Sequence, residues 1–341
     1  MWYQTKATSI TGIKYPIIQG PLGDGLSTTQ LLSAVSNAGG LGSYGAHTCS
    51  PEQIIALNKK IRTLTPHPYN INLWVSNGDE EASTQSLTKF AQLQAFFQPY
   101  FDELSIPIPT YPSQTPVKFE AQATAVLQAR PPVFSFAFGI PPAAIIRECR
   151  QQHIITIGTA TTLEEAVALE EASVDLVIAT GIEAGWHCPA FLHPAENNAT
   201  GIFVLIQQLT HRIKTPVIAA GGIADGKGIA AALTLGAAGV QIGTAFLACE
   251  ESGATNTQKQ RMFADDAMQN IQQQPPLAQE ATRSFYLQSL FLLPLKEAAI
   301  AQHKTDLLTF WYGTISSILR HTNATKLMQA LIADTTAILK K

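Results

Sequence analysis

The stretch that most constrains the fold is residues 216–246, which contains two apolar runs, each followed by a glycine turn. Residues 216–220 are apolar without polar alternation, a pattern typical of a parallel strand buried on both faces. Asp225 can cap a helix that spans residues 226–235. A second buried strand follows at residues 239–244. The stretch therefore predicts a strand–helix–strand unit of a parallel α/β sheet.

The two glycine turns of this unit also predict a site for an anion. Gly222, preceded by Gly221, and Gly243 carry no Cβ, so a ligand can approach the backbone N–H groups closely there. Such N–H groups favour a phosphate, and (β/α)8 barrels usually bind phosphate on the loops after their last two strands. Thr244 and Gln241 add a hydroxyl and a side-chain amide. We expect a phosphate site here; two ordinary tight turns are the alternative.

The rest of the chain repeats the same alternation of short apolar runs and helical patterns. The eight expected strands lie at residues 15–20, 39–45, 69–75, 133–139, 154–158, 174–180, 216–220 and 239–244. Periodicity alone would also allow an open doubly wound sheet. Eight βα units with glycines after nearly every strand favour closure, so we predict an α/β fold of the (β/α)8 (TIM) barrel type.

Some segments fall outside this alternation and predict additions to a barrel formed by residues 1–247. Residues 76–130 are too many for a single crossover connection, so we expect an insertion that reaches over the barrel mouth. Residues 248–317 are mostly helical in pattern and predict a cap domain beside the mouth. Residues 318–341 predict a helix that returns to the barrel.

The composition argues against several classes of partner. Charged residues make up only 14% of the 341 residues, the net charge is −3, and Lys and Arg do not cluster, which argues against nucleic acid. No apolar run is long enough to span a membrane, and the N-terminal segment lacks the apolar core of a signal peptide. The four cysteines are scattered, which fits a reduced cytoplasm. We therefore expect a cytoplasmic protein that acts on a small molecule; the oligomeric state stays open.

The strongest candidate for chemistry is His187, at the end of the segment 180–187. The segment follows the sixth expected strand, where the catalytic residues of barrels cluster, and histidine is the side chain whose unperturbed pKa lies nearest neutrality. A loop histidine bonded to backbone is the alternative. We expect Glu183 to anchor the backbone rather than act as a base. Cys188 is not expected to pair with its neighbour, because adjacent side chains rarely face each other.

These motifs together resemble the nitronate monooxygenase family, once called 2-nitropropane dioxygenases, and within it the class I enzymes. Residues 216–246 are similar to the FMN-phosphate region of the family. Residues 180–187 (TGIEAGWH) resemble its E-A-G-G-H motif, whose histidine is the active-site residue. Residues 19–22, 37–42 and 70–74 resemble its N-terminal and third-strand blocks.

The resemblance implies that FMN is the cofactor and that His187 is the catalytic residue. The positions that it implies for flavin binding are Gln19, Gly20, Pro21, Leu22, Asn72, Thr180, Gly185, Gly221, Gly222, Gln241, Gly243 and Thr244. For Asn72, a hydrogen bond at the end of a strand is the alternative.

The sequence also departs from the family pattern. Thr180 stands where a glutamine is usual, Trp186 replaces the second glycine before the histidine, and Ala137 stands where many members carry a second histidine. Residues 284–288 replace a usual Ser-Gly-Arg-x-Ala-Arg block. These changes bear on the substrate, and we expect Ala137, Trp186 and Tyr286 to line its pocket.

The activity implied by the resemblance is the oxidation of alkyl nitronates by O₂ to carbonyl compounds and nitrogen oxides. His187 would hold the nitronate oxygens or take the α-proton from a neutral nitroalkane. Two alternatives stay open: an FMN-dependent NAD(P)H reductase of the enoyl-ACP reductase type, and a diverged flavin-binding paralogue without turnover. No metal site is expected, because His153 and His193 have no partner at metal-ligand spacing.

Overall fold

The computed structural model describes residues 1–23, 25–75, 84–111, 117–185, 188–193, 200–264, 285–302, 304, 307 and 314–340. The chain divides into two compact units. The larger unit comprises Met1–Val75, Lys118–Met268 and Trp311–Lys341, and the smaller comprises Ser76–Val117 and Gln269–Phe310. No described helix is both long enough and apolar enough to cross a bilayer.

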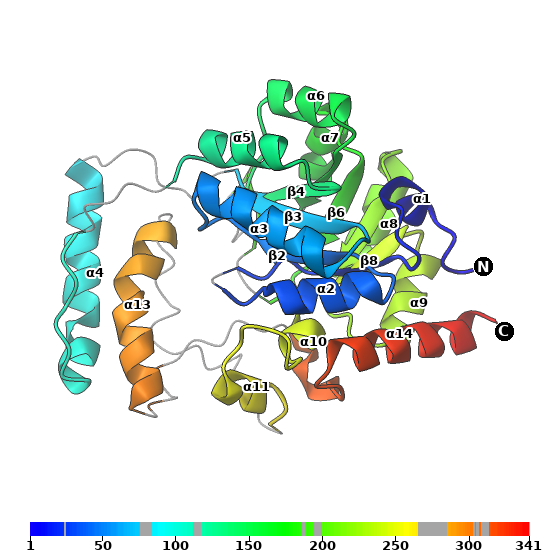
Figure 1. Ribbon diagram of the computed structural model, residues 1–341. Coiled ribbons are helices and arrows are strands. Elements are labelled where there is room, and N and C mark those ends of the chain that lie inside the picture. Colours follow the sequence, from blue (N-terminus) through cyan, green and yellow to red (C-terminus); the bar gives the residue numbers. More distant parts are fainter. Residues whose placement is uncertain are drawn as a thin grey trace. The chain divides into compact units, whose positions relative to one another are not determined.

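The core of the larger unit is a sheet of eight parallel strands surrounded by helices (Figure 1). The strands are β1 Ile17–Gln19, β2 Gly42–Gly45, β3 Tyr69–Trp74, β4 Val133–Ala137, β5 Ile155–Ala160, β6 Leu176–Thr180, β7 Val217–Ala220 and β8 Gly239–Ile242. Their order is β1-β8-β7-β6-β5-β4-β3-β2. Ile18 and Leu41 form a bridge between the β1 and β2 ends, so the barrel nearly closes. All eight expected strands and the (β/α)8 barrel are thereby confirmed.

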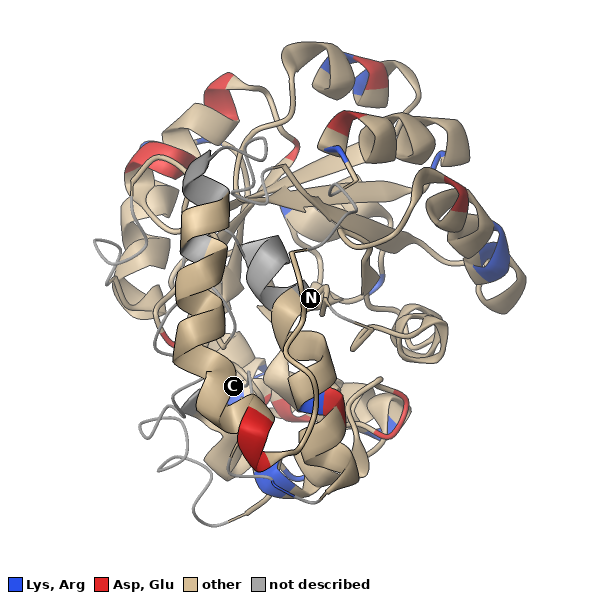
Figure 2. Cartoon of the chain, turned by 90° about the vertical axis from the view of Figure 1, so that its left-hand side faces the viewer, with Lys and Arg blue, Asp and Glu red and all other residues tan. Residues whose placement is uncertain are grey.

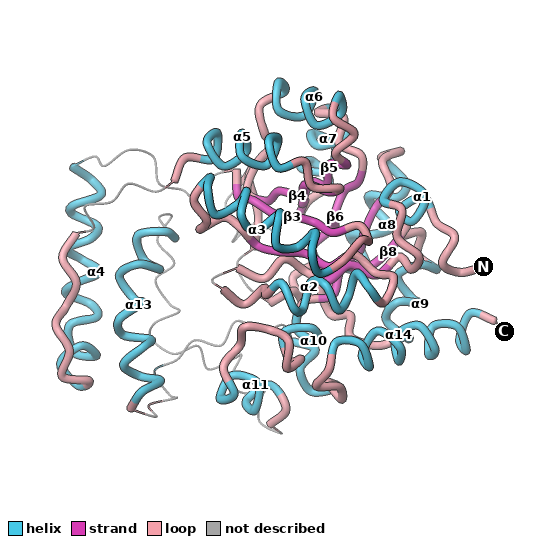
Figure 3. The backbone as a smooth tube through the Cα atoms, viewed as in Figure 1, coloured by secondary structure: helices cyan, strands magenta, loops and turns pink. Residues whose placement is uncertain are grey.

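The strands are buried along most of their length and carry no formal charge. None of the eight contains a charged residue. The tan strands of Figure 2 contrast with the blue and red residues on the helices and connections. Figure 3 shows the strands in magenta within the cyan helices of this unit. Gly42 sets how closely α2 approaches β2, because a Cβ at this position would lie 2.0 Å from the Leu32 carbonyl oxygen.

Most helices of the larger unit begin where the sequence offers a capping side chain. Ser50 forms a capping box with Gln53, Thr162 accepts from the Glu165 N–H, and Asp225 accepts from the Gly228 N–H as expected. The helices are α1 Lys6–Thr11, α2 Thr29–Asn37, α3 Pro51–Leu64, α5 Phe119–Ala129, α6 Ala143–Gln151, α7 Leu163–Glu171, α8 Ile202–Arg212, α9 Gly226–Thr234, α10 Thr244–Leu247, α11 Asn256–Met262, the 3₁₀ helix η4 Thr314–Ile318 and α14 Ala324–Leu339.

Helix α1 was not expected from the sequence. Thr5 and Thr8 form its capping box, and Gly12 ends it with a φ of 75°. Its Ala7 belongs to one buried cluster with Val133 and Leu176, the first residues of β4 and β6. The helix therefore covers the amino-terminal end of the barrel, away from the ends where the strands run into their βα loops.

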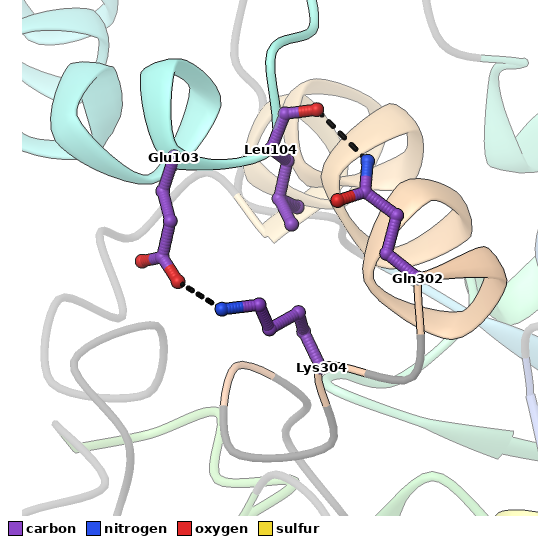
Figure 4. A network of polar contacts seen from close by, with 4 residues as sticks. All are labelled: Glu103, Leu104, Gln302 and Lys304. Carbon is purple, nitrogen blue, oxygen red and sulfur yellow. Dashed lines mark hydrogen bonds and ion pairs between the residues drawn. The ribbon is translucent and has the colours of Figure 1, made fainter.

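The smaller unit joins two segments that are far apart in the sequence. Helices α4 Thr84–Glu103 and α13 Phe285–Ala301 share a buried cluster that contains Phe97 and Phe291, whose ring centroids lie 5.8 Å apart. Figure 4 shows the polar contacts at one end of the pair. Gln302 Nε2 donates to the Leu104 carbonyl at 2.9 Å, and Lys304 Nζ lies 2.9 Å from Glu103 Oε1.

The bounds of the two units differ from the division expected from the sequence. The smaller unit draws on both the expected insertion, 76–130, and the expected cap, 248–317. Helix α5, which falls inside that expected insertion, belongs to the larger unit. The final helix α14 packs on α9: a Cβ at Gly226 would lie 2.5 Å from Asp334 Cβ.

Candidate functional site

A cavity of about 160 Å³ lies in the larger unit, where the strands run into their βα loops. The structure brings most of the expected site residues together around it. Those that line the cavity are Gly20, Pro21, Leu22, Asn72, Ala137, Thr180, Gly185, Gly221, Gly222, Gln241, Gly243 and Thr244. Because these residues lie on or directly after strands that are far apart in the sequence, the barrel itself assembles the site.

Four expected site residues are not among those that line the cavity. Gln19 is fully buried: its Oε1 accepts from the Ser43 N–H at 2.8 Å, and its Nε2 donates to the Gly20 carbonyl. Trp186 and His187 lie outside the described residues. Tyr286 belongs to α13 of the smaller unit, and its side chain is not among those described.

The turn after β7 depends on glycine. Gly221 and Gly222 have φ angles of 113° and 64°, in the region that side chains with a Cβ rarely adopt. A Cβ on Gly221 would also lie 3.0 Å from the Ala184 nitrogen. The turn therefore needs glycine for its own conformation and for its approach to the loop after β6.

The turn after β8 presents backbone to the cavity. Gly243 lines the cavity, and a Cβ added there would meet no heavy atom within 4 Å, so a side chain would extend into open space. Helix α10 starts directly after it, and the first intrahelical bond runs from the Leu247 N–H to the Gly243 carbonyl at 2.9 Å. The N–H groups of Ala245 and Phe246 precede that bond and belong to the first turn, which favours an anion.

Gln241 on β8 supplies a polar group that needs a partner. Its Oε1 is buried at the cavity and accepts no hydrogen bond from the described part of the chain. A buried acceptor without a donor costs free energy, so a ligand that donates there is favoured. The glycine cradle and this amide fit a ligand that combines a phosphate with hydroxyl or ring N–H donors, as a flavin nucleotide does.

Asn72 is held from below by a polar cluster inside the barrel. Its Nδ2 donates to Ser135 Oγ at 2.9 Å, and Asn70 Nδ2 donates to the same hydroxyl at 2.8 Å. Asn72 thus makes the strand-end hydrogen bond that the sequence left as an alternative, and it lines the cavity as well. The bond to Ser135 fixes the orientation of the amide.

Two carboxylates anchor described residues of the loop after β6. Glu183 accepts from the Ile202 N–H at 3.1 and 2.9 Å through its two oxygens, which confirms the expected backbone anchor. Glu165 is fully buried on α7, and its Oε1 accepts from the N–H groups of Phe191 and Leu192 at 2.6 and 3.1 Å. The sequence interpretation missed Glu165, whose only signal is an acidic residue on the apolar face of its helix.

The buried thiols have no features of nucleophiles. Burial raises the pKa of Cys149 and of Cys249 to about 12, and it also raises the pKa of Cys49. All three therefore stay protonated near neutral pH, and a thiolate, not a thiol, is the reactive form. Within the described residues, no group of three His, Cys, Asp or Glu side chains is arranged to hold a metal ion.

The sequence interpretation also missed the apolar side chains of the cavity. Those not expected are Trp74, Phe138, Ala184, Pro189, Ala220, Ile223, Leu247 and Ile315. Trp74 and Phe138 lie at the ends of the third and fourth expected strands. At such a position an aromatic residue is as common in a protein core as in a ligand site. Only the barrel register, which pairs Trp74 with Ala137, brings them to the same wall.

Comparison with known proteins identifies the family. The sequence model for nitronate monooxygenase matches residues 4–270. A probable nitronate monooxygenase of Staphylococcus haemolyticus (strain JCSC1435) is 39% identical over 267 residues, which cover 77% of this chain and 73% of the relative. Another from Staphylococcus saprophyticus subsp. saprophyticus is 32% identical over 360 residues, with complete coverage of both chains (100%).

Solved structures agree with this family. A nitroalkane oxidase from Streptomyces ansochromogenes superposes with a TM-score of 0.86 at 28% identity, covering 98% of this chain and 99% of that one. FabK from Thermotoga maritima shares the fold, with a TM-score of 0.68 at 22% identity and coverage of 99% and 97%. From the family match and the full-length relative, this chain belongs to the nitronate monooxygenase family and is an oxidoreductase of that flavin-dependent group.

Proposed function

We propose that this protein is an FMN-dependent enzyme that oxidises alkyl nitronates, or the parent nitroalkanes, with O₂ to carbonyl compounds and nitrogen oxides. The observation that carries the proposal is one cavity that joins a glycine cradle after β7 and β8 to the loop after β6. The glycine cradle is suited to a phosphate, and the chain of the loop after β6 continues to His187 in the sequence. Relatives named as probable nitronate monooxygenases support the substrate class.

The choice of FMN over FAD rests on the single phosphate site. The N–H groups near Gly222 and Gly243 would hold the one phosphate. The G-x-G-x-x-G run at residues 40–45 leads into and forms strand β2, and it does not form the turn between a strand and a helix that a dinucleotide site needs. Gln241 would accept a hydrogen bond from the cofactor through its buried oxygen. Asn72 and Thr180 would contact the flavin nearer the strand ends. When bound, FMN supplies the electron transfer, and the protein supplies its position and electrostatic surroundings.

His187 would act on the substrate. Its imidazole takes the α-proton from a neutral nitroalkane, which leaves the anionic nitronate, or it donates a hydrogen bond to the nitronate oxygens. The anchors at Glu183 and Glu165 hold the described residues on both sides of this position. Anchors before and after His187 in the sequence suit a residue that must meet a small substrate in a defined orientation.

The test of the function is anaerobic mixing of the FMN-loaded protein with ethyl nitronate and, separately, with NADH, while the flavin spectrum is recorded. Bleaching by the nitronate and a return of the yellow form with O₂ are expected. Bleaching by NADH alone would identify a reductase of the enoyl-ACP type instead. A flavin that neither compound reduces would indicate a protein without this turnover.

The phosphate cradle is tested by Gly243→Val. Because a side chain at Gly243 meets open space and not protein, the melting temperature without FMN should stay close to wild type. The affinity for FMN should fall at least about tenfold, since the valine occupies the volume of the ligand. The FMN affinity of Gly243→Ala should lie between those of wild type and Gly243→Val. Unchanged FMN affinity in Gly243→Val would show that the phosphate does not bind at this turn.

The role of His187 is tested by His187→Asn with two forms of one substrate. A general base contributes about 10²–10⁴ in rate, so kcat/KM for neutral nitroethane should fall by about that factor while the FMN content is retained. The loss with ethyl nitronate should be smaller, because that substrate has already lost its proton. Equal losses would assign the imidazole to binding, and full activity on both would exclude His187 from the reaction.

A further inference from the structure

One wall of the cavity is aromatic. Trp74 is the last residue of β3 and pairs in register with Ala137 on β4, and both residues line the cavity with the next residue, Phe138. The indole of Trp74 and the ring of Phe138 lie 4.6 Å apart between centroids, at an interplanar angle of 55°. The two rings therefore form one continuous apolar surface beside a small side chain.

His47 braces this wall from the loop after β2. Its imidazole stacks on the Trp74 indole with a centroid distance of 3.8 Å and an interplanar angle of 3°. His47 and Trp74 expose only 6% and 8% of their surface, so the stack is enclosed. A stacked neighbour fixes the plane of the indole. Trp74 therefore presents the same part of its ring to the cavity whichever ligand is bound.

Phe138 reaches the cavity through a strained backbone. Its φ is 60°, a value that is rare for a bulky side chain, and the following Gly139 has a φ of 150°. A Cβ at Gly139 would lie 3.0 Å from the Val75 side chain, so the glycine is required for the turn to close. Strained residues of this kind persist where the surrounding structure enforces them, and they gather at ligand sites.

The charge of the cavity supports an apolar role for the wall. Glu183 is the one charged side chain among the described residues that line the cavity, and its oxygens accept from the Ile202 N–H. The described lining thus offers no cation to a charged substituent. Aromatic faces and edges favour flat rings over saturated groups of the same size.

From these observations we infer that Trp74 and Phe138, braced by His47, form a selectivity wall for nitro compounds that carry an aryl or other flat unsaturated group near the nitro-bearing carbon. The inference rests on the proposed function, since it concerns the substrate of the same cavity. Trp74 and Phe138 contact the substituent, whereas His47 acts through Trp74 as a positioning residue.

The test compares two nitronates of nearly equal size, those of 1-nitro-2-phenylethane and 1-nitro-2-cyclohexylethane. Ring geometry is worth a factor of about 2–10 beyond buried area, so wild-type kcat/KM should favour the phenyl compound by about that factor. Trp74→Leu and Phe138→Leu should each bring the ratio close to one. His47→Leu should lower the phenyl-to-cyclohexyl ratio to a value between that of wild type and one, since the indole remains but loses the imidazole stacked on it.

Phe136→Leu is the matched control for Phe138→Leu. Phe136 lies two residues earlier on β4, is fully buried in the cluster between the sheet and its helices, and does not line the cavity. The substitution should lower stability and leave the phenyl-to-cyclohexyl ratio unchanged. An equal change of the ratio in Phe136→Leu and Phe138→Leu would overturn the proposed selectivity wall, because any core defect would then produce the same change of the ratio.

A binding measurement separates the wall from the reaction. The dissociation constants of 2-phenylethanol and 2-cyclohexylethanol are measured on the FMN-loaded protein from the shift of the flavin spectrum. A phenyl preference that Trp74→Leu abolishes would support the wall even if no nitronate is oxidised. Nitronate oxidation without any phenyl preference would refute the wall and leave the function standing. Loss of FMN from Trp74→Leu and Phe138→Leu would also refute it, because the rings would then be cofactor contacts.

Discussion

Replacing Glu165 by glutamine should destabilise the protein more than its small change in shape suggests. The carboxylate is fully buried and accepts four hydrogen bonds. Oε2 takes the N–H and the hydroxyl of Thr161, both at 2.7 Å, and Oε1 takes the N–H groups of Phe191 and Leu192. A glutamine has only one acceptor oxygen, so one of the two pairs of donors must face an NH₂ group.

The cost follows from those contacts. If the amide oxygen stays with Phe191 and Leu192, the Thr161 hydroxyl can turn to accept, but the Thr161 N–H is left buried without an acceptor, which costs about 1–3 kcal/mol. The two bonds that remain lose their charge assistance, about 1 kcal/mol each. Relief from burying a carboxylate offsets part of this. The free energy of unfolding should therefore fall by about 2–4 kcal/mol.

The assay is calorimetric melting of the FMN-loaded Glu165→Gln and Glu164→Gln variants side by side. Glu164 is exposed in the same first turn of α7, so its variant makes the same chemical change without buried donors and should stay within about 0.5 kcal/mol of wild type. At about 2–4 °C per kcal/mol, Glu165→Gln should melt about 4–16 °C lower. A difference between the two variants below about 2 °C would refute the reasoning from unsatisfied donors.

Three further predictions concern packing and the buried thiols. Gly42→Ala should fail to fold or melt far below Gly243→Ala, because its Cβ would lie 2.0 Å from the Leu32 carbonyl oxygen whereas Gly243 faces open space; expression and melting temperature check this. Cys149 and Cys249 should resist iodoacetamide at about pH 8 until the protein unfolds, as mass spectrometry would detect, since burial raises each pKa from 9.0 to about 12. Each thiol keeps its proton in the folded protein, whereas the unfolded chain releases it above about pH 9. The contribution of the two thiols to stability is therefore complete below about pH 9 and is lost as the pH rises toward about 12. The free energy of unfolding in urea should fall less steeply with alkaline pH in Cys149→Ala than in wild type, and an equal slope would contradict this.

The barrel could be predicted because its signals are local. Each strand is a short uncharged segment, and many helices begin at a Ser, Thr or Asp cap such as Ser50, Thr162 or Asp225. Most positions expected to hold a cofactor came from the family resemblance, and they line one cavity because they lie at or after the carboxyl ends of strands that all end on one side of a parallel barrel. The register places Ala220 beside Gln241 and so joins the last two turns in one cradle.

The rest depends on contacts between distant parts of the chain. The smaller unit pairs α4 with α13, nearly two hundred residues apart (Gln302 with Leu104, 198 positions), and nothing within either helix indicates its partner. The short α1 carries too few residues for a periodic pattern. The stack of His47 on Trp74 joins the loop after β2 to the end of β3. The amide of Gln19, expected to contact a flavin, hydrogen-bonds to the Ser43 N–H and the Gly20 carbonyl, which are brought to it by the barrel.

The two carboxylates after β6 connect the stability of the fold to the proposed chemistry. Glu183 ties the start of the loop to the first turn of α8, and Glu165 ties residues 191 and 192 to α7, so described residues before and after positions 186 and 187 are held by the helical layer. Glu183 stands inside the recognised motif, whereas Glu165 lies on a preceding helix and acts only through tertiary contact. If His187 performs the proposed proton transfer, Glu165→Gln should lower kcat/KM for neutral nitroethane even well below its melting temperature, while Glu164→Gln does not. Equal activity of the two variants at that temperature would mean that Glu165 stabilises the fold without positioning the loop.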